Sequence, residues 1–326
     1  HKQIDIILCD LQMPEMDGIE VIRHLANDGF GGGIVLVSGE DNRVLKTAEN
    51  MASVRGLNVI GSLSKPVPVH NIIALMNKYA VSEQKTSWSM PDVTADELDD
   101  AIRAGEIVAY YQPQIDIKTG RVKCVETLAR WPHPERGMIS PDIFIDMAER
   151  HDLIDALTDR IITQATLQGA EWHRQGIDIN VAINISMNNL RHLDFPDRLH
   201  DIVRNAGMDI KKLVIEITES QLVKDLGTCL DILTRLRLKG PTLSIDDFGT
   251  GYASMEHLKE MPFEELKIDR AFVNGACKDD TARAILESSI FLAKQLNMAT
   301  VAEGVETSND WDLVTALGCD VIQGYY

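Results

Sequence analysis

Strand-like and helix-like patterns alternate along most of the chain from residue 96 onward. Runs of β-forming residues are separated by segments with helical spacing of apolar positions, such as PDIFIDMAER and TARAILESSIFLAKQL. The eight predicted strands span residues 108–115, 122–129, 179–186, 213–218, 242–247, 265–269, 299–305 and 320–325. Eight strands with intervening helices predict an α/β barrel of the TIM type. Only the turn DIKTG joins the first two strands, and because a parallel crossover needs a dozen or more residues, these two are predicted to pair antiparallel.

A shorter α/β pattern occupies the region before residue 80. Three apolar runs, the first from Ile4 to Cys9, alternate with helical segments, which predicts a parallel, doubly wound, flavodoxin-like sheet. These runs end near Asp10, Ser38 and Lys65. An aspartate nucleophile, a hydroxyl that senses phosphate and a lysine that neutralises it would form a phosphoryl-acceptor set. The alternative is a structural module that accepts no phosphate.

Polar residues stand near the C-terminal ends of seven successive barrel strands. They are Glu126, Asn184, Glu216, Asp246 with Asp247, Lys267, Glu303 and Gln323. A barrel gathers these strand ends on one face. Since unpaired buried charge is costly, divalent cations are the natural partners of five converging carboxylates. A ligand set of oxygen atoms without His or Cys indicates Mg²⁺ or Mn²⁺ rather than Zn²⁺.

The Asp246-Asp247 doublet sharpens this prediction. One of its carboxylates could bridge two cations, an arrangement that serves in-line hydrolysis of a phosphodiester. Alone, such a doublet would more often be a solvated acidic turn, and the whole set could be a structural acidic cluster. The convergence of the strand ends favours metal-dependent phosphodiester chemistry.

Composition narrows the class of protein further. A net charge of −18 argues against unaided binding of a nucleic-acid polymer, so an anionic substrate needs cations or a local Arg. No apolar run approaches the length of a membrane span. The five scattered cysteines lack CxxC spacing and indicate reduced thiols in a cytoplasmic protein.

Residues 1–80 resemble the C-terminal part of a response-regulator receiver domain. DLQMPEMDG matches the acceptor-site signature, and Ser38 and Lys65 fall at the positions of the family's switch hydroxyl and Lys-Pro pair. The resemblance implies phosphorylation of Asp10 by a histidine kinase, with Mg²⁺ bound. The acidic pair that holds Mg²⁺ in the family belongs to an earlier strand that this sequence does not include, and Ser62 replaces the frequent aromatic switch residue.

Residues 96–326 resemble the EAL-domain family of cyclic-di-GMP phosphodiesterases, through the motifs YYQP, ETLARW, NIS, EITES, IDDFGTGYASMEHL, LKIDR, AEGVET and QGYY. The resemblance implies hydrolysis of cyclic-di-GMP to linear pGpG with two Mg²⁺ or Mn²⁺ ions. It implies that the first metal is held by four residues, Glu126, Asn184, Glu216 and Asp246. Asp246 would bridge to a second metal that Asp247 also binds.

The same resemblance assigns the remaining site residues. Lys267 would orient the attacking water, and Glu303 would be the second-site acid with general base as its possible role. Gln112, Arg130, Gln323 and Glu306 would line the substrate site, Arg130 for a phosphate and Glu306 for a guanine edge. Glu219 would hold the DFGTGY loop in a working conformation. The signature reads Glu-Thr-Leu instead of Glu-Ala-Leu; Thr127 points away from the site along a strand, so little loss is expected.

Taken together, these patterns predict three segments: a partial receiver domain in 1–80, a linker in 81–95 and an EAL barrel in 96–326. The predicted function is that of a two-component response regulator that hydrolyses cyclic-di-GMP. The alternative is a catalytically silent EAL-type receptor that binds cyclic-di-GMP and signals through a protein partner; a plain interaction module would not need the carboxylate ring. A homodimer through the EAL domain is expected from the resemblance, as is a last helix after Tyr326.

Overall fold

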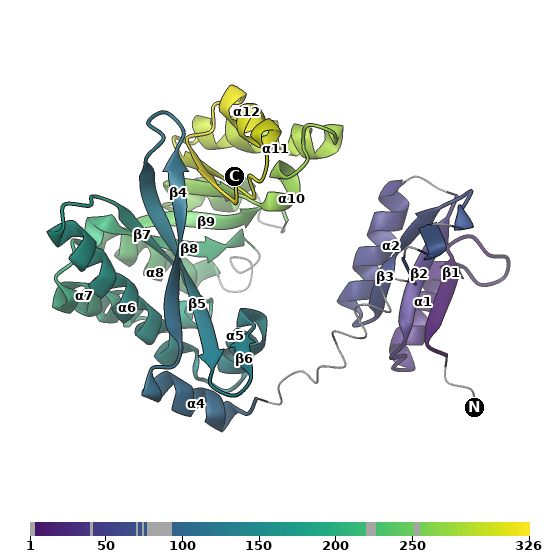
Figure 1. Cartoon of the computed structure of the whole chain (residues 1–326), viewed down its shortest axis with the longest axis horizontal. Helices are drawn as coiled ribbons and strands as arrows, with labels where there is room; N and C mark the ends of the chain where they lie inside the picture. Colours follow the sequence, from purple (N-terminus) through teal and green to yellow (C-terminus); the bar gives the residue numbers. More distant parts are fainter. Residues whose placement is uncertain are drawn as a thin grey trace. The chain divides into compact units, whose positions relative to one another are not determined.

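The computed structural model describes residues 4–39, 42–69, 71–73, 75–76, 93–219, 226–250 and 255–326. Figure 1 shows the course of the chain, which divides into two compact units, His1–Asp92 and Val93–Tyr326. Most of the predicted linker and residues 251–254 of the predicted DFGTGY loop lie outside the described residues. Among the described helices, none is both long and apolar enough to cross a membrane.

The first unit contains a parallel three-stranded sheet in the order β1 (Ile6–Asp10), β2 (Gly33–Ser38), β3 (Asn58–Ser64). Two helices accompany it, α1 (Gly18–Asn27) and α2 (Asn42–Val54). Apolar residues of the strands and of both helices, including Ile34 and Leu36 of β2, form one buried cluster. The predicted parallel α/β unit is therefore confirmed.

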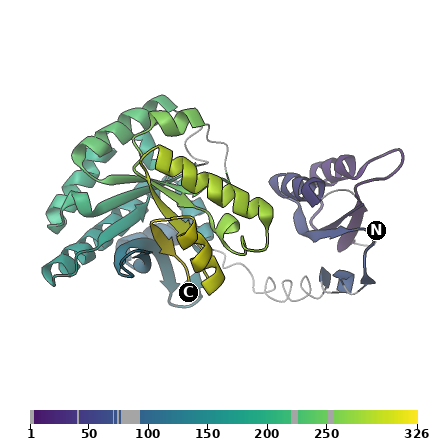
Figure 2. The ribbon, with the colours of Figure 1, turned by 90° about the horizontal axis from the view of Figure 1, so that it is seen from above.

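The second unit is a closed barrel. Its strands are β4 (Val108–Asp116), β5 (Val122–His133), β7 (Asn180–Asn184), β8 (Leu213–Thr218), β9 (Thr242–Phe248), β10 (Glu265–Ile268), β11 (Ala299–Glu303) and β12 (Val321–Gln323). They pair in the order β4-β12-β11-β10-β9-β8-β7-β5, and β4 also pairs with β5, which closes the ring. Figure 2 shows the helices surrounding these strands. The predicted eight-stranded barrel is confirmed within the described residues.

The first barrel strand runs against its neighbours. β4 is antiparallel to β5 and to β12, whereas the pairings from β5 through β7 to β12 are parallel. The short DIKTG turn leaves no room for a crossover, so the predicted hairpin is also confirmed. β4 is thus the seam at which the ring closes.

Helices cover the outside of the barrel. They are α4 (Ala95–Ala104), α5 (Pro141–Arg150), α6 (Ile154–Arg174), α7 (Phe195–Ala206), α8 (Leu226–Lys239), α9 (Met255–Glu260), α10 (Arg270–Val273), α11 (Asp280–Gln295) and α12 (Ser308–Ala316), with short 3-10 turns at Asn189–Arg191 and Ile210–Lys212. Their apolar faces form one continuous core with the outward faces of the strands, in which Trp131, Phe144 and Phe195 are fully buried.

A short strand, β6 (Gly137–Ile139), extends β5 as an antiparallel hairpin that the sequence pattern did not predict. The helix α4 starts at Ala95, where the Thr94 side chain caps it by accepting a hydrogen bond from the amide of Glu97. The Glu97 carboxylate, however, contacts Arg136 and His133 of this hairpin. The first helix after the linker region is therefore tied to the strand that carries Glu126.

Candidate active site

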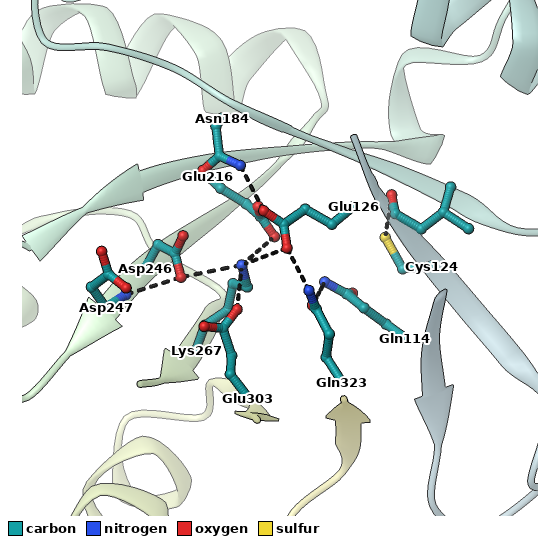
Figure 3. A network of polar contacts seen from close by, with 11 residues as sticks. Gln114, Cys124, Glu126, Asn184, Glu216, Asp246, Asp247, Lys267, Glu303 and Gln323 are labelled. Atoms are coloured by element: carbon teal, nitrogen blue, oxygen red, sulfur yellow. Dashed lines mark hydrogen bonds and ion pairs between the residues drawn. The ribbon is translucent and has the colours of Figure 1, made fainter. Parts of the chain in front are cut away.

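The C-terminal ends of the parallel strands bring four carboxylates around one ammonium group (Figure 3). Lys267, from β10, is fully buried. Its Nζ lies 2.8 Å from Glu303 Oε1, 3.1 Å from Asp246 Oδ1, 3.2 Å from Glu216 Oε1 and 3.5 Å from Glu126 Oε2. Each acid comes from a different strand, and the inward alternation of side chains aims all of them at the barrel axis.

Charge is not balanced within this group. Burial by itself lowers the pKa of Lys267, but the surrounding carboxylates, Glu216 foremost, raise it well above its usual value. The lysine is therefore a fixed cation at neutral pH. One positive charge among four acids leaves room for further positive charge in the site.

The carboxylates of Glu216 and Glu126 differ in their hydrogen bonds. Burial raises the pKa of Glu216 well above its ordinary value, and neither of its carboxylate oxygens has a hydrogen-bond partner. Glu126 accepts a bond at each oxygen, from Asn184 Nδ2 at 2.7 Å and from Gln323 Nε2 at 2.6 Å. Although burial raises the pKa of Glu126, Lys267 and these two donors bring it below the usual value.

A second group of acids adjoins the first. The oxygens of Glu126, Glu216 and Asp246 lie within 4.8 Å of one another, and so do those of Asp246, Asp247 and Glu303. Asp246 belongs to both groups. Burial and the charge of Asp246 raise the pKa of Asp247 to about 6, and burial raises the pKa of Glu303 to about 7. Asp247 also has a positive φ of 55°, a strained conformation for a non-glycine residue.

These residues fit divalent cations. The fully buried, unbonded oxygens of Glu216 need a partner that can approach from inside the barrel. Asn184 donates its amide NH₂ to Glu126, which turns its carbonyl oxygen away from that acid and toward potential ligand positions. Carboxylate and amide oxygens suit hard cations. The two acid groups could therefore hold two ions, with Asp246 between them.

The residues predicted to contact substrate are more dispersed. Gln112 on β4 pairs with Glu126 across the hairpin and is half-buried, so its side chain shares the inward face. Arg130 is half-buried on β5, and its Nη1 donates to the carbonyl of Ala129. Glu306 is exposed in the segment after β11. The first two therefore lie on the β4–β5 hairpin, and Glu306 follows β11, which is separated from β4 by β12 alone.

A pocket adjoins the acid cluster between β5, β7 and the helices α5 and α6. Arg130 and Asn184 line it together with Glu149 and Ser186. Ser186 Oγ donates to Glu149 Oε1 at 2.5 Å. The sequence patterns did not single out this Glu–Ser pair, because Glu149 lies within an ordinary amphipathic helix.

Glu219 lies at the end of β8 and is buried. Its Oε2 accepts a hydrogen bond from the amide of Gly249 at 2.8 Å, directly after the strand that carries Asp246 and Asp247. Gly249 has a φ of +100°, and a Cβ there would come within 2.8 Å of Phe272. The carboxylate thus fixes the backbone where the DFGTGY loop begins.

In the first unit, the three predicted receiver residues lie at one edge of the sheet. Asp10 ends β1 and forms an ion pair with the ammonium of Lys65. Its Oδ1 accepts from the amide of Gln12 at 3.0 Å, and these two contacts, that of Lys65 first, lower the pKa of Asp10. Ser38 ends β2 and is buried, with its carbonyl accepting from the amide of Lys65.

One buried residue of the cluster was missed by sequence reasoning. Gln114 on β4 is 1 % exposed, and its Nε2 donates to Gln323 Oε1 at 3.0 Å. It stands two residues after Gln112 on the same strand, so strand alternation would have placed it on the same inward face. The two-residue alternation of side chains along β4 was therefore sufficient to predict that Gln114 faces the barrel interior.

Comparison with known proteins defines the class. The EAL domain family model matches residues 95–326, and the response regulator receiver domain model matches residues 1–77. The chain belongs to the EAL domain family, with a receiver-type segment ahead of the barrel.

The similar proteins match either nearly the whole chain or about 70% of it. The chain is 32% identical to the cyclic di-GMP phosphodiesterase RocR of Pseudomonas aeruginosa, over 99% of this chain and 83% of RocR. It is 36% identical to the bifunctional diguanylate cyclase/cyclic di-GMP phosphodiesterase MucR of the same organism, over 70% of this chain but only 34% of MucR. The solved structure of the PaMucR phosphodiesterase in its c-di-GMP complex matches with a TM-score of 0.68 and 36% identity, over 71% of this chain and 94% of that one.

Proposed function

We propose that this chain hydrolyses cyclic-di-GMP to linear pGpG with two Mg²⁺ or Mn²⁺ ions. The observation that carries the proposal is the pair of acid groups that share Asp246. The similarity to RocR and to the c-di-GMP complex of PaMucR supports the choice of substrate. When bound, two such cations neutralise phosphoryl oxygens and make a water molecule more acidic.

The protein's own residues divide the remaining work. Glu126, Asn184, Glu216 and Asp246 would hold the first cation, and Asp246 and Asp247 would hold the second. Lys267 presents a fixed ammonium that orients the attacking water. Glu303 lies beside that ammonium and, with its pKa near 7, can take up a proton at neutral pH.

Substrate binding draws on the pocket next to the acids. Arg130 supplies the cation that an acidic protein needs for a phosphate. Gln112 lies opposite Glu126 on β4, and Gln323 on β12 donates to Glu126, so both place amides at the substrate site. Glu306 approaches a guanine edge from the other part of the rim. Glu219 acts through Gly249 on the backbone that carries both aspartates.

A product assay tests this function. The protein is incubated with cyclic-di-GMP and Mg²⁺, and the products are separated by chromatography. Accumulation of pGpG is expected, and it should vanish in Glu126→Ala. Binding of the dinucleotide without pGpG formation would leave the silent receptor as the function.

We further propose that phosphorylation of Asp10 by a histidine kinase regulates the hydrolysis. The ion pair between Asp10 and Lys65 and the place of Ser38 on the next strand support this role. In this proposal, residues 1–80 form the receiver, 81–95 the linker and 96–326 the EAL domain. A small phosphodonor should change the turnover of a protein that carries the complete receiver domain, and Asp10→Asn should remove that response.

The proposal also includes a homodimer formed through the barrel. Light scattering coupled to size exclusion should give twice the mass of one chain. A monomeric mass in the presence of substrate and Mg²⁺ would contradict the dimer and leave the hydrolysis unaffected.

A further inference from the structure

A chain of side-chain amides runs under the acid cluster (Figure 3). Gln114 Nε2 donates to Gln323 Oε1 at 3.0 Å, and Gln323 Nε2 donates to Glu126 Oε2 at 2.6 Å. The three residues come from three adjacent strands, β4, β12 and β5. All three are at least nine-tenths buried. The chain of bonds therefore ends on a carboxylate assigned to the first cation.

The direction of these bonds decides what the chain can do. A glutamine amide has one face that donates and one that accepts. Because Gln114 offers an N–H to the carbonyl oxygen of Gln323, the NH₂ group of Gln323 is left facing Glu126. If the amide of Gln323 turned over, it would present its oxygen to an oxygen of Glu126, and the two would repel.

We infer that Gln114 is a positioning residue that fixes the amide of Gln323 and thereby aims the Glu126 carboxylate at the first cation. With Gln323 on one oxygen and Asn184 on the other, the plane of the Glu126 carboxylate is held from both sides. Outer partners of this kind orient the ligands that touch a metal. The inference rests on the proposed two-cation site and adds a residue to it.

The antiparallel seam explains how Gln114 reaches this position. β4 pairs with β12 on one side and with β5 on the other, and Gln114 lies opposite Cys124, one inward residue deeper than Glu126. It therefore supports the site from below, whereas Gln112 lies level with Glu126. The two glutamines differ in their depth below the strand ends and therefore in their roles. Gln112 can reach a substrate, whereas Gln114 acts through Gln323.

The test measures Mn²⁺ binding by the electron paramagnetic resonance signal of free Mn²⁺, without substrate. Gln114→Met keeps the length of the side chain and removes the donor. The dissociation constant of this variant for Mn²⁺ at the tighter of the two sites is expected to rise by about 10- to 100-fold. The same shift should appear in the Mn²⁺ concentration for half-maximal turnover, with turnover at saturating Mn²⁺ much less affected.

The matched control is Gln164→Met. Gln164 on α6 is half-buried, and its side chain bonds the backbone of Ala109 in β4 and of Ile107 just before the strand. Its loss should lower the thermal unfolding temperature and leave Mn²⁺ affinity unchanged. A fall in Mn²⁺ affinity in this control as large as in Gln114→Met would reduce the effect to general destabilisation and overturn the inference.

A double-mutant cycle with Gln323→Ala isolates the route of action. If Gln114 acts through Gln323, Gln114→Met should weaken Mn²⁺ binding in the wild-type background and add nothing in Gln323→Ala. Equal weakening in both backgrounds, or wild-type affinity in Gln114→Met, would overturn the inference while leaving the hydrolysis intact. Failure of the wild-type protein to bind Mn²⁺ would instead overturn the proposed two-cation site and this inference with it.

Discussion

Glu216 is the least solvated acid of the site and the one with the fewest bonds. Its two oxygens are buried without a hydrogen bond, and the ammonium of Lys267 lies 3.2 Å from one of them. Such a carboxyl is unfavourable in the metal-free protein, because folding at neutral pH has either to desolvate its charge or to protonate it. The residue thus serves ligand binding at the expense of stability.

Glu216→Gln should separate these two effects. Without metal, the free energy of unfolding is expected to rise by about 1–2 kcal/mol, because the variant keeps the shape and loses the charge. The stabilisation that Mg²⁺ gives the wild-type protein should disappear. Urea unfolding with EDTA and with Mg²⁺ measures both, and Glu265→Gln, a buried acid outside both metal-capable groups, should keep the Mg²⁺ response.

The raised pKa of Glu303 gives metal-free stability a definite pH dependence. Its pKa is about 7 in the folded protein against an ordinary 4.5, so between these values the folded state holds a proton that the unfolded state has lost. Stability therefore falls as pH rises through this window and levels off above pH 7. Each unit of difference between the two pKa values corresponds to about 1.4 kcal/mol, so this carboxyl lowers the free energy of unfolding by roughly 3 kcal/mol across the window.

Glu303→Gln should flatten that part of the profile. The measurement is urea unfolding in EDTA at intervals from pH 4 to pH 8, for the variant and the wild-type protein. Asp247, whose pKa is raised from 3.8 to about 6, adds a dependence of the same sign in both proteins, over a window that lies at lower pH. Identical slopes for the two proteins would show that Glu303 is not the titrating group.

At the level of the elements, the sequence predicted the strands well and their ends less well. β8 was predicted to the residue, whereas β7 and β12 are shorter than expected. Apolar runs identify what is buried, but the residues where pairing stops depend on the neighbouring strand. β6 was missed because Gly137–Ile139 is too short to show a period.

Side-chain partners were harder to predict than positions. The carboxylates and Lys267 were placed on one rim because barrel geometry alone gathers the strand ends. Their individual bonds depend on distances of a few tenths of an ångström. Glu97 illustrates this limit: its place three residues after Thr94 suits a capping box, yet its carboxylate contacts His133 and Arg136.

Gly324 holds the end of β12 against the segment after β11. The amide of Val305 donates to the carbonyl of Gln323, and the amide of Tyr326 donates to the carbonyl of Val305. A Cβ at Gly324 would lie 1.9 Å from that second carbonyl oxygen. Any side chain there must move the backbone that carries Gln323.

Gly324→Ala should therefore lower turnover by at least about tenfold, because small displacements of site residues have large effects on rate. The control is Gly318→Ala, which has a positive φ of 75° but meets only the flexible end of Lys294. It should lose about 1 kcal/mol of stability and keep its turnover. Steady-state kinetics and thermal unfolding of both variants distinguish the outcomes, and equal turnover in the two would refute the role of Gly324.

At the scale of the whole molecule, the described residues form one large hydrophobic core in each unit, and a small third cluster of Cys124, Ala182 and Val214 lies on barrel strands. One buried cluster contains residues from Cys9 to Leu57, and the other contains residues from Val93 to Ile322. No residue belongs to both among those described. The two units therefore have independent sources of stability.

Calorimetry should show this independence as two unfolding transitions. Glu216→Gln is expected to change the unfolding temperature of residues 93–326 alone. Leu36→Ala should lower the unfolding temperature of the first unit alone, because it removes about 2–5 kcal/mol from the free energy of unfolding of that unit. A single transition that both variants shift equally would contradict independent cores.

The seam at β4 also determines when the site can exist during synthesis. Gln114 and Gln323 are hydrogen-bonded across 209 positions of sequence, and β4 gains its second neighbour only when β12 is present. Contacts of such long range form late, because most of the loop entropy has to be lost first. A nascent chain therefore carries Glu126 long before Gln323, the residue that holds one of its carboxylate oxygens, has been synthesised.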